Sequence, residues 1–486
     1  MSRLESYFAK FRQNIIGIDQ TFESPYGRKK IIYADWIASG RLYKPIEDKM
    51  ISDFGPFVAN THSESSTTGM IMTNAYKHAQ KFIKAHVNAN ESDVIIAAGS
   101  GMTGVVNKFI RILGLRVPEQ LKPFLNISED LRPVIFISHI EHHSNQTSWL
   151  ETLADVVIIP PADDGSVSPA NLKTELKKYK NKKLKIGTFS ACSNVTGIHA
   201  PYHELAEIMH SEGGYCFVDF ACSAPYMDIN MHPANSEQSL DAIFFSPHKF
   251  LGGPGTPGVL IFNSNLYHNQ VPDHPGGGTV DWTNPWGQHR FVSSIEARED
   301  GGTPPFLQTI KTALTLGLKD QMGTGNMLQR EEELVDIIFD KFPAIPKLHL
   351  LAGNITHRLG AISFYLEDIH YNLAVKLLND KYGIQVRGGC SCAGTYGHFL
   401  LHVDPNRSKH ITDLIDSGDL SEKPGWVRVS LHPTMTDDEL FMIIEALNEI
   451  VRNYSSWAKD YYYSNHTNEF LHKEQKFKDL NISFNF

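Results

Sequence analysis

Cysteine is scarce in this chain. Only five thiols occur among 486 residues, at positions 192, 216, 222, 390 and 392, and their spacing fits no disulfide framework. Such a low density of cysteine is typical of a reducing compartment. The first stretch, MSRLESYFAKFRQNIIG, lacks the pattern of a signal peptide, and no run of about 18 apolar residues predicts a membrane span. We therefore expect a cytoplasmic protein.

An excess of positive charge is also missing. The chain has 45 Lys and Arg against 54 Asp and Glu, which gives a net charge of −9. Neither nucleic acid nor an anionic membrane surface is an expected partner for such a chain. Internal repeats and low-complexity linkers are absent from the sequence. A hydrophobic content of 41% and this length predict a globular protein of two or three domains, or of one large domain with an appendage.

The middle of the chain alternates apolar runs with amphipathic stretches. The runs are rich in Val, Ile and Phe, and the stretches 168–180 and 202–213 predict helices. Continuous apolar strands that alternate with helices indicate a parallel sheet covered on both faces. The predicted strands are 133–138, 155–160, 183–189, 215–220, 242–246 and 258–263.

The pattern changes near residue 306. A long helical stretch, 306–342, precedes predicted strands at 361–367 and 426–432 and a terminal helix at 436–454, which Thr436 and Glu439 are spaced to cap. This is typical of a smaller α+β domain. The segment 116–133 is predicted to be a surface insertion, and the tail either packs on a neighbour or frays. The expected units are an N-terminal segment packing on the small domain (1–32), a large domain (33–305), the small domain (306–454) and the tail (455–486).

The loops that follow the predicted strands carry the chemically informative residues. In open α/β sheets, ligands bind beyond the carboxyl ends of the strands. Lys249 follows the strand 242–246 and is flanked by Ser246 and His248. A lysine amine can form a Schiff base with a carbonyl cofactor, although a lone lysine in this position is more often a solvated loop residue.

Pyridoxal phosphate needs three further groups. Asp219 ends the strand 215–220 and can hold a ring-nitrogen proton, or act only as a helix cap. The stretch 97–110 is a small-residue turn that opens a helix, where backbone N–H groups can bind phosphate. The histidine pair in EHHSN (141–145) supplies a ring for stacking. Each has an ordinary structural explanation, but their joint placement on one sheet edge predicts a pyridoxal phosphate site.

Two other motifs do not support a ligand. Gly253, Gly255 and Gly258 match a dinucleotide spacing, but they precede a strand where that motif precedes a helix. The C-x-C of VRGGCSCAG (386–394) lacks a second ligand pair, so no metal site is predicted. A disulfide between these two cysteines would close a strained loop. A nucleophile with a neighbour, or two packed thiols, remain open.

In these stretches the chain resembles the class V aminotransferase family, and within it the cysteine desulfurases and selenocysteine lyases. The resemblance runs from about residue 33 to about residue 452 and rests on EHHSN, VDFACSAP, FFSPHKFLGGPGTPG and VRGGCSC…VRVSL, in that order. The GCSC detail also resembles the desulfurase domain of molybdenum cofactor sulfurases. The resemblance implies a fold-type I α/β protein with a mostly parallel seven-stranded sheet, a pyridoxal 5'-phosphate cofactor, a cysteine or selenocysteine substrate, a homodimer and a protein sulfur acceptor.

The resemblance also implies residue roles. Lys249 forms the Schiff base and moves the α-proton, Asp219 pairs with the ring nitrogen, and His142 stacks on the ring. Cys392 takes the substrate sulfur as a persulfide while Arg428 binds the α-carboxylate. Arg387 or a histidine is a candidate for lowering the pKa of Cys392, and Cys390 is expected mainly to pack. The further contacts are Gly101, Met102, Thr103, Asn194, Ser246 and His248 to the cofactor, Thr303 to the cofactor of a partner subunit, and Ala38, His62 and Asn194 to the substrate.

One position departs from the family pattern. The family usually has Gln or His at the end of D-x-A-Q/H, where its side chain bonds the phenolic oxygen of the cofactor, and this chain has Cys222. A thiol is a poorer hydrogen-bond partner. A lyase, epimerase or aminotransferase-like enzyme that does not use Cys392 covalently therefore stays open. A non-catalytic redox or metal-sensing protein on the same fold is the alternative from another class.

Overall fold

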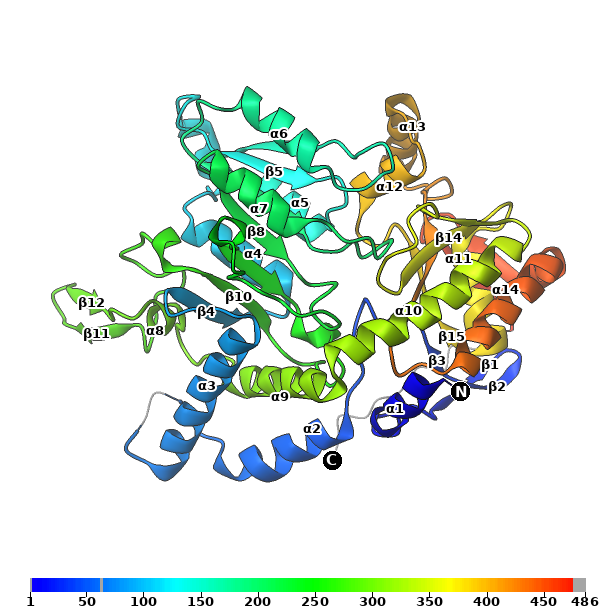
Figure 1. Ribbon diagram of the computed structural model, residues 1–486, viewed down its shortest axis with the longest axis horizontal. Helices are drawn as coiled ribbons and strands as arrows, with labels where there is room; N and C mark the ends of the chain where they lie inside the picture. The colour runs from blue at the N-terminus through cyan, green and yellow to red at the C-terminus, as the bar shows by residue number, and fades with distance from the viewer. Residues whose placement is uncertain (1, 62–63, 475–486) are drawn as a thin grey trace.

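A seven-stranded sheet forms the centre of the computed structural model, which describes residues 2–61 and 64–474 (Figure 1). Its strands are β4 (Asp93–Ala98), β5 (Val134–Ser138), β6 (Asp155–Ile159), β7 (Lys185–Ser190), β8 (Tyr215–Asp219), β9 (Ala242–Phe245) and β10 (Gly258–Asn263). They stand in the order β4-β10-β9-β8-β7-β5-β6. Neighbours from β9 to β6 are parallel, and β10 is antiparallel to both of its neighbours. The predicted mostly parallel seven-stranded sheet is confirmed.

Helices cover both faces of this sheet. Helices α4 (Met102–Ile112) and α5 (His143–Leu150) pack on one face, and α3 (Thr67–His86), α6 (Pro169–Lys178), α7 (Tyr202–Ser211) and α9 (Phe306–Met322) pack on the other. Along β5, Val134 and Phe136 join one core while Ile135 and Ile137 join the other. Because both faces are buried, the strands are apolar along most of their length, and the polar residues stand mainly at their ends.

A second, antiparallel sheet lies beside the first (Figure 1). It consists of β13 (Leu348–Leu350), β14 (Ala361–Leu366), β17 (Trp426–Ser430) and β16 (Arg387–Gly389), in that order. Helices α10 (Thr324–Lys341), α11 (Tyr371–Leu377) and α14 (Asp437–Trp457) accompany it. The capping box of Thr436 and Glu439 at the start of α14 is confirmed.

The single long helix expected over 306–342 is wrong. Helix α9 ends at Met322 and α10 begins at Thr324. The residue between them is Gly323, whose φ of +75° lies in the left-handed region. A glycine reaches this conformation without a Cβ clash, so the chain breaks the helix there.

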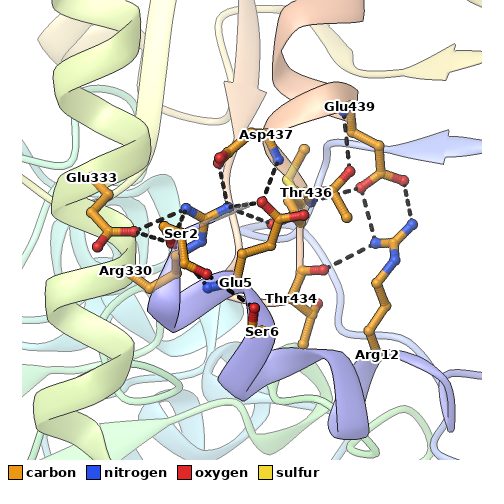
Figure 2. A network of polar contacts seen from close by, with 11 residues as sticks. Ser2, Glu5, Ser6, Arg12, Arg330, Glu333, Thr434, Thr436, Asp437 and Glu439 are labelled. Atoms are coloured by element: carbon orange, nitrogen blue, oxygen red, sulfur yellow. Dashed lines mark hydrogen bonds and ion pairs between the residues drawn. The ribbon is translucent and has the colours of Figure 1, made fainter.

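The first helix, α1 (Arg3–Arg12), is anchored to α10 and to the start of α14 by a polar network (Figure 2). The hydroxyl of Ser2, which caps α1, donates to Glu333 of α10 at 2.8 Å. Arg330 of α10 pairs with Glu5 of α1 at 3.8 Å and donates to Asp437 of α14 at 2.7 Å. Arg12 of α1 forms a bidentate pair with Glu439, at 2.6 and 2.9 Å. The strands β1 (Thr21–Ser24) and β2 (Gly27–Lys30) form a hairpin, and β3 (Ile32–Tyr33) pairs in parallel with β15 (Ile384–Gln385).

The described part of the tail folds onto its own chain. Beyond α14 it forms a hairpin of β18 (Tyr461–Ser464) and β19 (Glu469–His472). The Tyr461 hydroxyl donates to Asp380 at 3.0 Å, and the Asn468 amide donates to the Tyr371 hydroxyl at 2.5 Å. Residues 455–474 of the tail are therefore folded against their own chain rather than frayed, while 475–486 lie outside the described residues.

Short elements complete the fold. Among the described residues, no helix is both long and apolar enough to cross a membrane. Segment 116–133 is mostly exposed, as expected of a surface insertion. The remaining elements are α2 (Lys44–Lys49), α8 (Ile295–Glu299), α12 (Gly394–Leu400), α13 (Pro405–Asp416), the hairpin β11 (Val280–Thr283) and β12 (His289–Phe291), and the short helices η1 (Met50–Phe54), η2 (Gly55–Phe57), η3 (Glu119–Phe124), η4 (Ser236–Gln238), η5 (Pro247–Lys249), η6 (Ser264–Leu266), η7 (Phe342–Ala344), η8 (Leu378–Tyr382) and η9 (Ala458–Asp460).

Candidate active site

A cavity of about 510 Å³ opens at the carboxyl ends of β7, β8 and β9, beside the start of α4. The predicted site residues that line it are Ala38, Gly101, Met102, Thr103, His142, Asn194, Asp219, Cys222, Ser246, His248, Lys249, Cys392 and Arg428. Thr303 is not among them and lines a separate cavity with Gly301 and Pro304. His62 lies outside the described residues.

Lys249 and Asp219 are two of the ionisable groups that line the cavity. Lys249 ends η5, directly after β9, and burial lowers the pKa of its amine while the charges of Cys222 and Asp219 oppose that change. Asp219 ends β8 and accepts the N–H of Ala221 at 2.8 Å. Burial raises the pKa of Asp219 to about 7. Both groups therefore titrate closer to neutrality than usual, as functional groups in clefts often do.

The start of α4 forms a cradle that suits a phosphate. The hydroxyl of Ser246 accepts the N–H of Met102 at 2.8 Å. A Cβ at position 101 would lie 2.9 Å from Cε1 of His248, so only glycine fits there. The hydroxyl of Thr103 pairs with that of Ser144 at 2.6 Å. First-turn N–H groups of a helix attract anions, so these residues fit the phosphate of the predicted cofactor.

His142 lies at the N-cap of α5, at the rim of the cavity. Its Nδ1 accepts the N–H of Ser144 at 3.1 Å, so in the neutral ring Nε2 carries the proton. Burial, together with the charge of Lys249, lowers the pKa of His142 to about 3. The ring is therefore neutral near pH 7.

Glu141 holds the turn that carries His142, and the sequence reading did not assign it a role. It is buried and accepts the hydroxyl of Ser190 at 2.6 Å and the amide of Asn145 at 2.7 Å. Burial raises the pKa of Glu141. The signal that points to it is its place in EHHSN, directly before the histidine pair.

The cysteine loop between β16 and α12 is held in an unusual conformation. Ser391 and Cys392 have φ of +51° and +56°, a region that costs free energy for residues with a side chain. The Asn194 amide donates to the Ser391 carbonyl at 2.7 Å, and the His143 N–H donates to the Cys392 carbonyl at 2.8 Å. Cys392 is exposed, whereas Cys390 is half-buried and packs against the sheet core.

The same loop has a second bond to α5. The His143 N–H bond to the Cys392 carbonyl, at 2.8 Å, is matched by the Gly394 N–H, which donates to Nε2 of His143 at 2.9 Å. His143 therefore contacts the loop at Cys392 itself and at Gly394, two residues further along. Sequence reading placed His143 beside the site but gave it no separate role.

Arg428 on β17 is the buried cation of the cavity. Its Nη2 donates to Asp35 at 2.7 Å and its Nη1 donates to the carbonyl of Asn194 at 3.0 Å. Its Nε is buried and finds no acceptor among the described residues. Arg387 donates to the other oxygen of Asp35 at 3.2 Å. The sequence analysis gave Asp35 no role, although it lies in the stretch YADWIASG (33–40), where the resemblance begins.

A second cysteine accompanies Cys222. Cys192 follows β7, and its sulfur lies 4.0 Å from that of Cys222. Both thiols are buried and line the cavity. Cys192 was counted in the sequence but not assigned to the site, because contact between loops of neighbouring strands is a property of the fold. No cluster of three or more His, Cys, Asp or Glu able to hold a metal occurs in the described ranges.

Comparison with known proteins places this geometry in a family. The family model for class-V aminotransferases matches residues 32–442. A probable cysteine desulfurase from Staphylococcus epidermidis is 28% identical over 378 residues, which cover 76% of this chain and 85% of the relative. A probable cysteine desulfurase from Staphylococcus aureus is 26% identical over 370 residues, covering 75% and 84%.

Solved structures share the fold. A cysteine desulfurase from Thermococcus onnurineus superposes with a TM-score of 0.72 at 20% identity, covering 91% of this chain and 98% of that one. A cysteine desulfurase from Escherichia coli gives a TM-score of 0.68 at 20% identity, covering 92% and 98%. The family resemblance and the fold class expected from the sequence are thus confirmed, and the chain belongs to the class-V aminotransferase family.

Proposed function

We propose that this protein is a pyridoxal 5'-phosphate-dependent cysteine desulfurase that converts L-cysteine to L-alanine and keeps the sulfur as a persulfide on Cys392. One observation carries the proposal: Lys249, Asp219 and Cys392 line the same cavity. The names of the relatives from Staphylococcus support the same reaction.

The chain offers a partner for each part of the cofactor. The N–H groups at the start of α4, with Ser246 and His248, would hold the phosphate, and Asp219 would hold the ring nitrogen. His142 would pack on the ring, and Cys222 and Asn194 would lie near its polar edge. When bound, the cofactor supplies an electron sink for negative charge at the substrate α-carbon.

Lys249 is the candidate base for the α-proton. Because burial lowers the pKa of its amine, a larger share of Lys249 is neutral near pH 7 than of an exposed lysine, and only the neutral amine accepts a proton. Arg428 would bind the substrate carboxylate through its Nε–H group, which has no acceptor among the described residues. The neutral His142 offers an Nε2–H donor, fixed by the bond that Nδ1 accepts.

Cys392 is the candidate nucleophile. Its thiolate attacks the substrate sulfur, the carbon–sulfur bond breaks, and the bonding electron pair stays with carbon, which then takes a proton to give alanine. The sulfur remains on Cys392 as a persulfide. Because Cys392 is exposed at the mouth of the cavity, a protein acceptor can reach the persulfide.

We infer that the enzyme works as a homodimer in which Thr303 serves the phosphate of the partner subunit. What supports this is the position of Thr303 in a cavity of its own, apart from the cavity that holds Lys249. A monomer in sedimentation at working concentration, with full activity, would contradict the inference.

The test of the function adds L-cysteine to the purified, cofactor-loaded protein. We expect alanine together with one added sulfur on Cys392, detected by mass spectrometry, and loss of both in Cys392→Ser. Alanine release that is unchanged in Cys392→Ser would contradict the persulfide mechanism and indicate a lyase. A protein that cannot take up the cofactor at Lys249, judged by borohydride fixation, would contradict the proposed function altogether.

A further inference from the structure

Two buried thiols line the cavity, and neither makes or breaks a bond in the proposed reaction. Cys192 and Cys222 follow the neighbouring parallel strands β7 and β8, on which Ser190 pairs in register with Asp219. Their sulfurs lie 4.0 Å apart. Both residues are buried, with 2% and 5% of their surfaces exposed. Both nevertheless line the cavity, so a small solute that enters it can reach them.

The two thiols differ in character. Contact with Cys192 lowers the pKa of Cys222, and the cations Lys249 and Arg428 add to this effect against the cost of burial. Burial and the same contact raise the pKa of Cys192 well above its ordinary value. The groups facing the pair that oppose a thiolate are the carboxyls of Asp219 and Glu331. One thiol thus favours the nucleophilic thiolate and the other stays protonated beside it, which is the arrangement of an attacking and a resolving cysteine.

We propose that Cys192 and Cys222 are a redox-active pair that forms a reversible disulfide with a hydroperoxide as oxidant. The Cys222 thiolate attacks the terminal hydroxyl oxygen of the hydroperoxide, the O–O bond breaks, and hydroxide leaves from hydrogen peroxide or an alkoxide from an organic hydroperoxide, so Cys222 becomes a sulfenic acid. The Cys192 sulfur then attacks the Cys222 sulfur, and the proton from Cys192 leaves with the hydroxyl group as water. Two electrons pass from the two thiols to the peroxide.

Closing the disulfide would disturb the residues that hold the cysteine loop. The sulfurs must approach from 4.0 Å to about 2 Å. The Cys192 thiol now contacts the carbonyl of Gly197 at 3.2 Å and would leave it. The turn between these two residues carries Asn194, which donates to the Ser391 carbonyl and accepts from Arg428. Oxidation would therefore move a shared support of the nucleophile loop and of the candidate carboxylate site.

The experiment uses the cofactor-loaded Cys392→Ser protein, which removes the exposed thiol as a competing target. It is treated with hydrogen peroxide, alkylated after unfolding, digested and analysed by mass spectrometry. We expect a linked peptide pair containing Cys192 and Cys222 that disappears on reduction with a dithiol. Cys216, buried on β8, should stay reduced and alkylatable, and so serves as an internal reference.

Single variants separate the pair from general oxidation. In the Cys392→Ser background, Cys192→Ser should leave Cys222 without a resolving thiol, so it should advance to the sulfinic acid. Cys216→Ser should leave the cross-link unchanged. Peroxide that oxidises Cys390 but never links Cys192 to Cys222, or that gives sulfinic acid at Cys222 while Cys192 is present, would overturn the proposal. None of these readouts uses desulfurase activity, so a failure of the proposed function would not be confused with a failure of the redox pair.

Discussion

The backbone N–H of His143 donates to the carbonyl of Cys392 at 2.8 Å. The contact joins the first turn of α5 to a residue whose φ of +56° is strained. Strained backbone persists only where its surroundings over-determine it. Three hydrogen bonds hold the loop in this conformation: the two that His143 makes, and the one that Asn194 donates to Ser391.

The role of His143 is testable because it supports the loop without lining the cavity. His143→Ala removes the acceptor of the Gly394 N–H, a loss of about 1–2 kcal/mol for a bond of this kind. We expect roughly a tenfold fall in kcat with L-cysteine, with the cofactor absorbance unchanged. Faster alkylation of Cys392 by iodoacetamide should accompany it, because the loop is freer.

His268→Ala is the matched control, since His268 is exposed and belongs to no part of the site. Its kcat and alkylation rate should equal those of the wild type. A His143→Ala protein with wild-type kcat would show that the loop does not need this support.

Cofactor affinity should depend on the ionisation of Asp219. The pKa of Asp219 is raised to about 7 by burial, and only the carboxylate pairs with a protonated ring nitrogen. The Lys249→Ala protein, which cannot form the Schiff base, should bind pyridoxal phosphate more weakly as pH falls from about 8 to about 6. Removing Lys249 takes away a charge that lowers the pKa of Asp219, so the midpoint should lie above 7.

The control is the double variant Lys249→Ala, Asp219→Asn. In this protein, ionisation of the cofactor phosphate still affects the pH dependence of cofactor binding, whereas ionisation of residue 219 does not. Its affinity should be lower and less dependent on pH, as measured by equilibrium dialysis. Identical pH profiles for the two proteins would contradict the role of Asp219.

Asp35 should compete with the substrate carboxylate, because it already pairs with Arg428 and Arg387. Asp35→Asn keeps an oxygen acceptor for Arg428 but removes the negative charge. We expect L-alanine to bind more tightly, by about 1 kcal/mol or roughly fivefold, in a titration followed by cofactor absorbance. The exposed Asp19→Asn variant is the control, and weaker alanine binding in Asp35→Asn would show that Asp35 orients Arg428 more than it competes.

The polar network that joins α1 to α10 and α14 should contribute to the free energy of unfolding. Arg330 is 1% exposed and pairs with Asp437 and Glu333. Removing one partner of a fully buried ion pair costs about 3–5 kcal/mol. The carboxyls of Asp437 and Glu333 are 24% and 34% exposed, so Arg330→Met should cost less than this but still lower the Tm measured by thermal denaturation. Arg452→Met, which removes an exposed pair with Glu449, should leave the Tm within error. Equal Tm values for both variants would mean that the network of Figure 2 adds nothing to the free energy of unfolding.

The large sheet was predictable from the sequence because its strands are buried on both faces. Such strands appear in the sequence as short, continuous apolar runs. Six of its strands were recognised from such runs, whereas β4 was read only as the small-residue turn that follows it. The strands β13 and β16 have three residues each, too few for an alternating pattern to register. The break at Gly323 was missed because apolar residues continue at helical spacing on both sides.

For the candidate site, the motifs located the groups that follow strands but not those that reach the cavity from a distance. Asp35 meets Arg428 across 393 residues, and Cys192 meets Cys222 only because their strands are neighbours. Asn194 shows the same limit: the resemblance gave it a cofactor or substrate contact, and the structure adds that its amide N–H donates to the carbonyl of Ser391, while its Oδ1 has no partner among the described residues. Such contacts depend on how the loops pack together.

The pairing of β3 with β15 has a consequence for the order of assembly. Ile32 pairs with Ile384, so this early strand must wait for most of the chain to be synthesised before its partner exists. Ribosomes add about 5–20 residues per second, which leaves the start of the chain exposed for tens of seconds. Contacts so distant in sequence also fold slowly. The candidate carboxylate site, built from Asp35 and Arg428, is therefore among the last parts of the molecule to form, and a truncated chain would lack it.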